Sequence, residues 1–345
     1  MRKGVKRMII ALQVLLTLLA AITIWFATAG PTLPRETNAI IDEVLSKELP
    51  EIIVGDTGYA LSDGLNIWYE SILPQGDPKG TVLLIMCNGG DALIWPPKFV
   101  RALVDAQYHV IRYDHRSTGM SDLVKDWDRN NPYLVTDMSR DAVAMLDATQ
   151  VKQAHIIGFS LGGMIAQEIA ITRPERVLSL TLMMTSGYIG DPNLPSLSSS
   201  YFFRSLLQGL PILKYRIMGG EKNLIKERIA KQLTSSGPAE LDIREIAELV
   251  LYDLRHRRGV SIQGALQHQT AVSASGSRYD GLSQLDVPTL VIHGTADEII
   301  PIEHGQRLAE LIPGTRRLWL EGVGHSFPVP NMKALISSIL GHLVQ

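Results

Sequence analysis

The part of the sequence that limits the fold of this chain most is a Gly-x-Ser-x-Gly motif. It lies where an apolar strand ends and a helix begins. The pentapeptide Gly158-Phe159-Ser160-Leu161-Gly162 directly follows the apolar run 154–157 and leads into a small-residue helix start at 162–164. The glycines avoid side-chain clashes where the strand reverses into the helix. The turn strains the serine backbone and holds its hydroxyl at the helix N-terminus, where free N–H groups favour negative charge. The motif predicts a nucleophilic serine; a glycine-rich turn with an incidental serine is the alternative.

Strand-like and helix-like segments alternate on both sides of this turn. The predicted strands are the runs at 51–54, 65–72, 81–86, 108–113, 154–157, 178–184, 289–293 and 317–320. The predicted helices lie at 99–106, 138–148, 164–171, 302–311 and 331–344. Strands that alternate with helices at this spacing form right-handed βαβ units. The sequence therefore predicts an α/β fold with a mostly parallel central sheet and helices on both faces.

The alternation stops between residues 187 and 281, where the sequence is first irregular and then mainly helical. We therefore predict a sheet domain built from residues 51–186 and 282–345, interrupted by a helical cap at 187–281. Ligands collect at the carboxyl ends of parallel strands, so the cap should lie over Ser160. An apolar stripe in the cap favours a hydrophobic acyl or alkoxy pocket, although such side chains can also simply hold the cap to the core. The stripe consists of Ile243, Ile246, Ala247, Val250, Leu251 and Leu254.

Residues 1–30 predict an N-terminal membrane anchor or signal segment. Four basic residues among the first seven precede the uncharged stretch 8–29. As a helix this stretch would be roughly 33 Å long, enough to cross a hydrocarbon core of ~30 Å. The length favours an uncleaved anchor; the alternative is a cleaved signal peptide, with a possible cleavage site at Ala27-Thr28-Ala29. Both interpretations place the rest of the chain outside the cytoplasm, because the basic end stays on the cytoplasmic side. Residues 31–50 predict a short amphipathic connector near the bilayer surface.

A serine hydroxyl becomes a good nucleophile only when a base takes its proton and a carboxylate orients that base. Among the nine histidines, His325 stands out because it lies on a glycine-rich loop after the last predicted strand. Asp297 follows an apolar strand and precedes His325, which gives the order serine, aspartate, histidine. Glu298 is a rival by adjacency. Asp114 also ends a strand, but it opens a tight loop in which holding the turn is the simpler role. We therefore predict Ser160, Asp297 and His325 as the catalytic residues.

Acyl chemistry at this serine also needs two N–H groups that stabilise the carbonyl oxygen as it gains negative charge. Removing one such donor typically costs ~3–4 kcal/mol of transition-state stabilisation. One donor should be the backbone N–H of Leu161, directly after the nucleophile. The other should come from the loop after the strand 81–86, where Asn88 is the first choice and Gly89 the alternative. Cys87 ends the same strand and is most simply a small core residue.

Composition and missing motifs exclude several other kinds of function. One cysteine in 345 residues cannot form an intramolecular disulfide or a zinc site built from several cysteines. A net charge of −2 provides no basic field, so we expect no nucleic-acid partner. The histidines are scattered, and the sequence has no H-E-x-x-H motif, Walker A loop or dinucleotide fingerprint. We therefore expect neither a metal nor a cofactor.

Over about residues 51–345 the chain resembles the α/β-hydrolase superfamily with an inserted cap. The resemblance looks closest to hydrolases like aclacinomycin methylesterase. It rests on the serine turn and on three further segments, at 86–96, 109–121 and 287–292. Two features depart from the family pattern: many relatives have His-Gly where this chain has Met86-Cys87, and the apolar segment 8–29 is not part of the hydrolase pattern.

The resemblance implies a cofactor-free, esterase-like mechanism. Ser160, Asp297 and His325 match the catalytic triad of the family, and Asn88 and Leu161 match its oxyanion positions. The combined prediction is a serine hydrolase that cleaves carboxylic esters with a hydrophobic acyl or alkoxy part, tethered to a membrane through residues 8–29. Acyl transfer and amide or peptide hydrolysis are alternatives on the same fold. A non-catalytic membrane receptor is an alternative of a different class.

Overall fold

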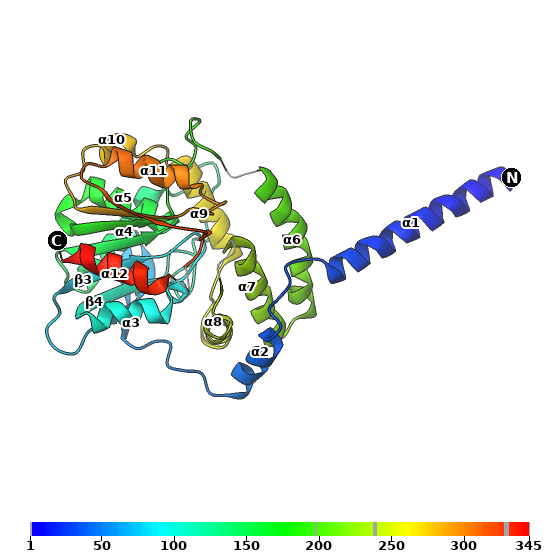
Figure 1. Cartoon of the computed structure of the whole chain (residues 1–345), viewed down its shortest axis with the longest axis horizontal. Helices are drawn as coiled ribbons and strands as arrows, with labels where there is room; N and C mark the ends of the chain where they lie inside the picture. The colour runs from blue at the N-terminus through cyan, green and yellow to red at the C-terminus, as the bar shows by residue number, and fades with distance from the viewer. Residues whose placement is uncertain (1, 197–198, 237–239, 328–330, 345) are drawn as a thin grey trace.

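The computed structural model describes residues 2–196, 199–236, 240–327 and 331–344, and its centre is an eight-stranded sheet (Figure 1). The strands are β1 (Asp56–Ser62), β2 (Leu65–Ile72), β3 (Gly80–Ile85), β4 (Tyr108–Tyr113), β5 (Ala154–Phe159), β6 (Val177–Met183), β7 (Thr289–Gly294) and β8 (Arg316–Leu320). Their order in the sheet is β1-β2-β4-β3-β5-β6-β7-β8. β2 pairs antiparallel with both β1 and β4, and all other neighbours pair parallel. The predicted mostly parallel sheet is thus confirmed.

Helices cover both faces of this sheet. One face packs against α3 (Pro97–Asp105) and α12 (Met332–Leu343), and the other against α4 (Val135–Ala148), α5 (Leu161–Thr172) and α11 (Ile302–Leu311). Successive side chains of a strand point to opposite faces, so Val82 and Leu84 of β3 join the first of these two cores and Leu83 and Ile85 join the second. The short helices are η1 (Ala92–Ile94), η2 (Pro174–Arg176) and α10 (Tyr279–Leu282).

The first strand differs from the sequence prediction, whereas the other predicted strands agree with the structure to within two residues. The run 51–54 is not a strand; the edge of the sheet is formed by β1, which the prediction missed. β1 forms a hairpin with β2 through Asp63 and Gly64, which both adopt positive φ. The backbone N–H groups of Val54 and Gly55 donate to the Glu70 carboxylate at 2.7 and 2.9 Å, so a side chain holds this segment instead of a neighbouring strand.

The insertion between β6 and β7 contains α6 (Ser199–Met218), α7 (Glu221–Ser235), α8 (Ile243–His256) and α9 (Ile262–Ala274), which we call the cap helices. In Figure 1 they stand beside the sheet, between it and the N-terminal helix. The expected connector helix is α2 (Thr37–Ser46). Its buried residues Ile41 and Val44 pack with Ile225, Ile229 and Leu251 of α7 and α8 in a core of their own. The apolar side of the connector therefore faces the cap helices.

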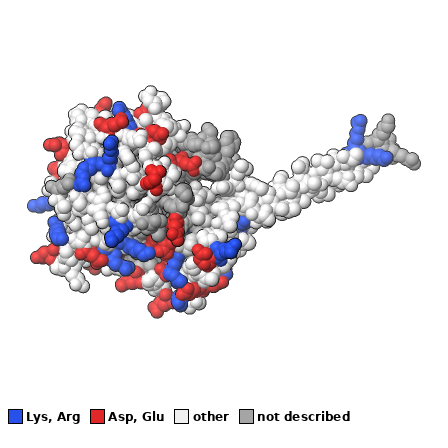
Figure 2. Space-filling view, viewed as in Figure 1, with Lys and Arg blue, Asp and Glu red and all other residues white. Residues whose placement is uncertain are grey.

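The predicted N-terminal apolar helix is α1 (Arg2–Thr28), which projects from the body of the protein (Figure 1). Its 25-residue stretch Gly4–Thr28 is long and apolar enough to cross a membrane, and it is unburied. In Figure 2 the surface of this helix is uncharged except at its N-terminal end. The other end rests on α6, where the Lys214 ammonium donates to the carbonyl oxygens of Ala27 and Ala29 at 3.0 and 2.9 Å. A cation at a helix C-terminus satisfies carbonyl groups that have no partner inside the helix.

Candidate active site

The serine turn has the strained geometry that the sequence predicts. Ser160 lies between β5 and α5 with φ 57° and ψ −118°, a conformation that side-chain-bearing residues rarely adopt. Its backbone is held on both sides: the N–H donates to Met183 O at 2.8 Å, and its carbonyl accepts from Thr185 Oγ1 at 2.7 Å. A Cβ at Gly162 would lie 2.0 Å from Ile85 O, so only glycine lets the helix start this close to β3.

The structure brings the three predicted catalytic side chains together. His325 Nδ1 lies 2.6 Å from Asp297 Oδ2, and His325 Nε2 lies 2.9 Å from Ser160 Oγ. An ionised carboxylate can only accept a hydrogen bond, so the imidazole proton resides on Nδ1. Nε2 is then an acceptor, and the serine hydroxyl donates to it. The hydroxyl proton therefore already points at the base that would remove it.

Asp297 is buried and firmly positioned, while its rival Glu298 is exposed. Oδ1 of Asp297 accepts the backbone N–H groups of Ile299 and Ile300, each at 2.9 Å. These bonds leave Oδ2 directed at His325. The two adjacent carboxylates thus differ in their surroundings: Asp297 is buried and contacts the imidazole, whereas Glu298 is exposed.

The loop that carries His325 is held by the cap as well as by the sheet. The N–H groups of Gly324 and His325 donate to Ser236 O and Ser235 O at 3.1 and 2.9 Å. Ser235 is the last residue of α7, so these carbonyl groups are free of helical partners and available as acceptors. The position of the imidazole consequently depends on where α7 lies.

The predicted oxyanion donors come from two elements of the fold. Leu161 is the first residue of α5, where the backbone N–H has no partner within the helix. Asn88 follows β3 and is exposed, and within the described part of the chain its N–H makes no hydrogen bond. The alternative donor, the N–H of Gly89, is occupied: it donates to His268 Nδ1 at 3.1 Å. This contact favours Asn88 over Gly89.

His268 is a residue of this site that sequence reasoning missed. It lies on α9, is fully buried, and its Nε2 lies 2.9 Å from Arg116 O. A carbonyl only accepts, so Nε2 carries the proton and Nδ1 is free to accept from Gly89. Burial lowers the pKa of His268 to about 3, which keeps the ring neutral. No local signal marks this histidine, because its partner lies 179 residues earlier in the chain.

Asp114 holds its turn, as its place in the sequence suggested, and it also joins the cap to the core. Its carboxylate accepts the backbone N–H groups of Ala92 and Met120 and pairs with Arg257, which follows α8, at 2.7 Å. The Arg257 guanidinium stacks over Trp68, 4.3 Å from the ring centroid. Burial raises the pKa of Asp114 to about 6 despite the neighbouring arginine. This contact fixes the end of α8 against the sheet.

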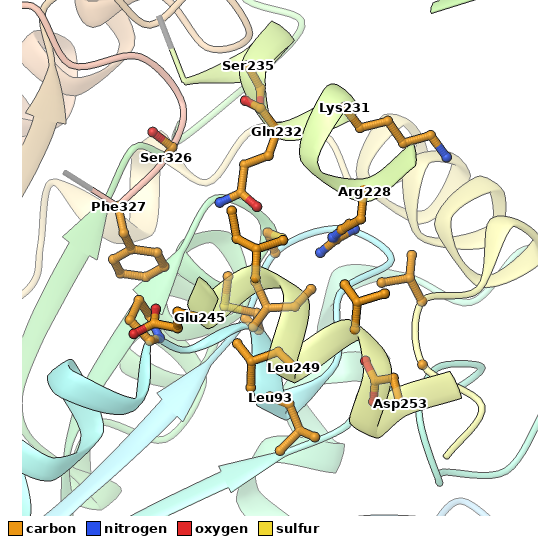
Figure 3. Close-up of a pocket in the computed structure, with 18 of the residues that line it drawn as sticks. Leu93, Arg228, Lys231, Gln232, Ser235, Glu245, Leu249, Asp253, Ser326 and Phe327 are labelled. Atoms are coloured by element: carbon orange, nitrogen blue, oxygen red, sulfur yellow. The ribbon is translucent and has the colours of Figure 1, made fainter. Parts of the chain in front are cut away.

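A cavity of about 500 Å³ extends from His325 to the space between α7 and α8 (Figure 3). Phe159 and His325 line the end next to the serine turn. Ile246, Val250 and Leu254 of the predicted apolar stripe line its cap side, together with several charged residues. Among the described residues, no group of three or more histidine, cysteine, aspartate or glutamate side chains is placed to hold a metal ion.

Known proteins share this sequence pattern. The family model for the α/β hydrolase fold matches residues 80–331. Rhodomycin D methylesterase DauP from Streptomyces sp. (strain C5) is 32% identical over 293 residues, which cover 81% of this chain and 95% of that protein. The putative carbamate hydrolase RutD from Variovorax paradoxus (strain S110) is 29% identical over 283 residues, covering 79% and 94%.

Solved structures share the fold. A hydrolase from Pseudomonas aeruginosa PA01 has a TM-score of 0.63 at 25% identity and covers 85% of this chain and 100% of its own. A membrane phospholipase A, described as a bacterial virulence factor, has a TM-score of 0.62 at 22% identity and covers 98% of both chains. The sheet, the serine turn and the inserted helices define an enzyme of the α/β-hydrolase class. The chain belongs to the α/β hydrolase fold family, and its relatives include proteins named as methylesterases.

Proposed function

We propose that this protein is a membrane-tethered serine hydrolase that cleaves carboxylic esters through Ser160, His325 and Asp297. The observation that carries the proposal is the continuous chain of hydrogen bonds from the serine hydroxyl through the imidazole to the buried carboxylate, at 2.9 and 2.6 Å. This arrangement activates a hydroxyl for attack on an acyl carbon. The similarity to rhodomycin D methylesterases supports an ester over other acyl substrates.

In the first half of the reaction, Ser160 Oγ attacks the ester carbonyl carbon while His325 Nε2 takes the hydroxyl proton. Asp297 stabilises the resulting imidazolium and keeps Nε2 directed at the serine. The backbone N–H groups of Leu161 and Asn88 stabilise the oxyanion of the tetrahedral intermediate. When that intermediate collapses, Nε2 returns the proton to the leaving alkoxide, and the acyl group remains on the serine.

In the second half, water replaces the alcohol. His325 takes a proton from the water as its oxygen attacks the acyl carbon, and the same oxyanion donors stabilise the second intermediate. Collapse returns the proton to Ser160 and releases a carboxylic acid. The apolar side chains of α8 in the cavity support an ester with a hydrophobic acyl or alkoxy part.

The N-terminal helix supports a membrane location. We propose that α1 spans the membrane with its basic end in the cytoplasm, and that the hydrolase domain lies on the other side. The contact of Lys214 with the end of α1 then holds the cap next to the membrane surface. Intact-mass analysis of membrane-extracted protein tests this: we expect residues 1–30 to be retained, and a mature chain that begins near Gly30 would instead indicate a cleaved signal peptide.

The catalytic proposal is tested with a fluorophosphonate probe and p-nitrophenyl esters of increasing chain length, using the full chain in a non-ionic detergent. We expect the probe to label the protein and Ser160→Ala to abolish both labelling and hydrolysis. Ser326→Ala is the matched control, because this serine is buried next to His325 in the same cavity, and its removal should leave labelling intact. Absence of labelling in folded wild-type protein would favour a receptor, and ester products formed with added alcohols would favour acyl transfer.

A further inference from the structure

One positively charged side chain in the cavity has no partner among the residues that the structure describes. Within the described part of the chain, five basic side chains line this space, and four of them have partners. Arg216 and Lys231 pair with Glu227, Arg257 pairs with Asp114, and Arg258 donates to the carbonyl of Gly119. Arg228 is the exception: no hydrogen bond or ion pair joins it to any described residue.

The Arg228 side chain lines the same cavity as His325. It extends from the middle of α7, and the side chain of Lys231, one turn along, extends in a different direction (Figure 3). Its charge also acts on the end of β3: burial raises the pKa of Cys87 to about 11, and the positive charge of Arg228 opposes that increase. Cys87 directly precedes Asn88, the proposed oxyanion donor. Arg228, Cys87 and His325 line the same cavity, so a substrate held next to His325 can extend through that cavity to Arg228.

Among the described residues, the acidic side chains of the cavity form no ion pair with Arg228. Asp242 pairs with Lys98 at 2.8 Å, and Asp253 Oδ1 lies 3.2 Å from Arg257 Nε. Glu227 is occupied by its two basic partners. Burial and the neighbouring charge of Asp242 raise the pKa of Glu245 to about 7, and burial and the charge of Asp91 raise that of Asp253 to about 8. Both carboxyl groups thus hold protons that ordinary carboxylates lose. A guanidinium has five N–H donors, and no described residue accepts from this half-buried one. An anion that accepts these hydrogen bonds would therefore bind favourably.

We propose that Arg228 binds an anionic group, a carboxylate or a phosphate, on the part of the substrate that does not react. This inference rests on the proposed function and names its substrate class: esters in which an apolar segment separates the reacting carbonyl from an anion. Leu224, Leu249 and Val250 provide apolar surface beside Arg228 for that segment. A planar guanidinium suits both carboxylate and phosphate oxygens, because it can donate two parallel hydrogen bonds to either.

The test compares three sets of p-nitrophenyl esters with the full chain in non-ionic detergent. The first set consists of monoesters of dicarboxylic acids from succinate to suberate, the second of neutral fatty-acid esters of the same lengths, and the third of phosphonate-terminated acyl esters. Arg228→Met removes the charge and retains much of the side-chain volume. Lys226→Met is the matched control, since it removes a cation from the same helix outside the cavity lining.

We expect Arg228→Met to reduce kcat/KM for the best anionic ester by about tenfold or more, mainly through KM, and to leave the neutral esters within about twofold. Lys226→Met should change neither, and Arg228→Lys should restore part of the loss. The dicarboxylate and phosphonate sets show which anion the site prefers. An equal effect of Arg228→Met on anionic and neutral esters would overturn the inference.

A binding measurement separates this inference from the proposed chemistry. Calorimetry with Ser160→Ala protein measures the affinity for the same anionic and neutral esters without turnover. We expect tighter binding of the anionic ester, and loss of that preference when Arg228→Met is added. If wild-type protein hydrolyses no ester yet this preference is present, the catalytic proposal fails and the anion site stands. If hydrolysis proceeds without any preference, the anion site fails.

Discussion

Replacing Asp297 with asparagine tests the proposed catalytic arrangement most sharply, because the structure dictates how the new amide must lie. Oδ1 of Asp297 accepts two backbone N–H groups at 2.9 Å, from Ile299 and Ile300. An amide nitrogen in that place would face two donors, so the asparagine oxygen keeps the Oδ1 position and its NH₂ group takes the place of Oδ2. That NH₂ group then lies where the carboxylate now accepts the proton of His325 Nδ1 at 2.6 Å.

The consequence is the wrong tautomer of the histidine. An NH₂ group can donate only to an unprotonated Nδ1, so the imidazole must carry its proton on Nε2. Nε2 then points a hydrogen at Ser160 Oγ and cannot accept the hydroxyl proton. We expect kcat to fall by about 10³- to 10⁴-fold, equivalent to about 4–5.5 kcal/mol of activation free energy, with little change in stability.

Steady-state hydrolysis of a p-nitrophenyl ester measures this loss, and thermal unfolding of the same preparation verifies the fold. Glu298→Gln is the matched control: it makes the same chemical change one residue along, on an exposed carboxylate, and should retain activity within about threefold. Retention of activity in Asp297→Asn to within tenfold would refute the tautomer argument. A loss of activity that is larger in Glu298→Gln than in Asp297→Asn would assign the acidic role to Glu298.

Two further predictions concern stability. Gly162→Ala should lower the free energy of unfolding by about 3 kcal/mol or more in denaturant titrations, because its Cβ would lie 2.0 Å from Ile85 O. Gly209→Ala is the control: its Cβ would lie in open space, so its free energy of unfolding should be close to that of the wild type. Similar changes in the two variants would contradict this. Burial raises the pKa of Asp253 from 3.8 to about 8, so the folded state keeps a proton that the unfolded state loses. Wild-type stability should therefore fall across this pH window, and the Tm advantage of Asp253→Asn should grow from pH 5 to pH 8 and then level off. A constant Tm difference would argue against a raised pKa.

The positions of the helices and strands were largely predictable from the sequence, because they depend on local patterns. Continuous apolar runs such as 154–159 and 289–294 are typical of strands buried on both faces, and the helices between them impose parallel pairing. The strand β1 was missed because its exposed and buried residues do not alternate regularly. It lies at the edge of the sheet, where most of its side chains stay exposed. The motif around Ser160 predicted its strained turn, since only glycine fits the close approach of α5 to β3.

The candidate catalytic residues were predictable as a set of residue types in a chain order, and their catalytic roles stay predictions. What could not be predicted is the contact made by the cap. His268 and Gly89 meet across 179 residues, and the choice between Asn88 and Gly89 as oxyanion donor depends on that contact. The support that α7 gives the His325 loop likewise leaves no trace in the local sequence.

The sequence by itself thus determined the sheet, the serine turn, the apolar N-terminal helix and the candidates for nucleophile, base and acid. These features follow from the order of side chains along a short stretch of backbone. Only the tertiary structure decided which of the candidate oxyanion donors already has a hydrogen-bond partner, how the cap holds the histidine loop, and which arginine in the cavity has no partner among the described residues. Those outcomes depend on which distant groups satisfy one another, and pairing between residues far apart in the chain is settled by packing rather than by local pattern.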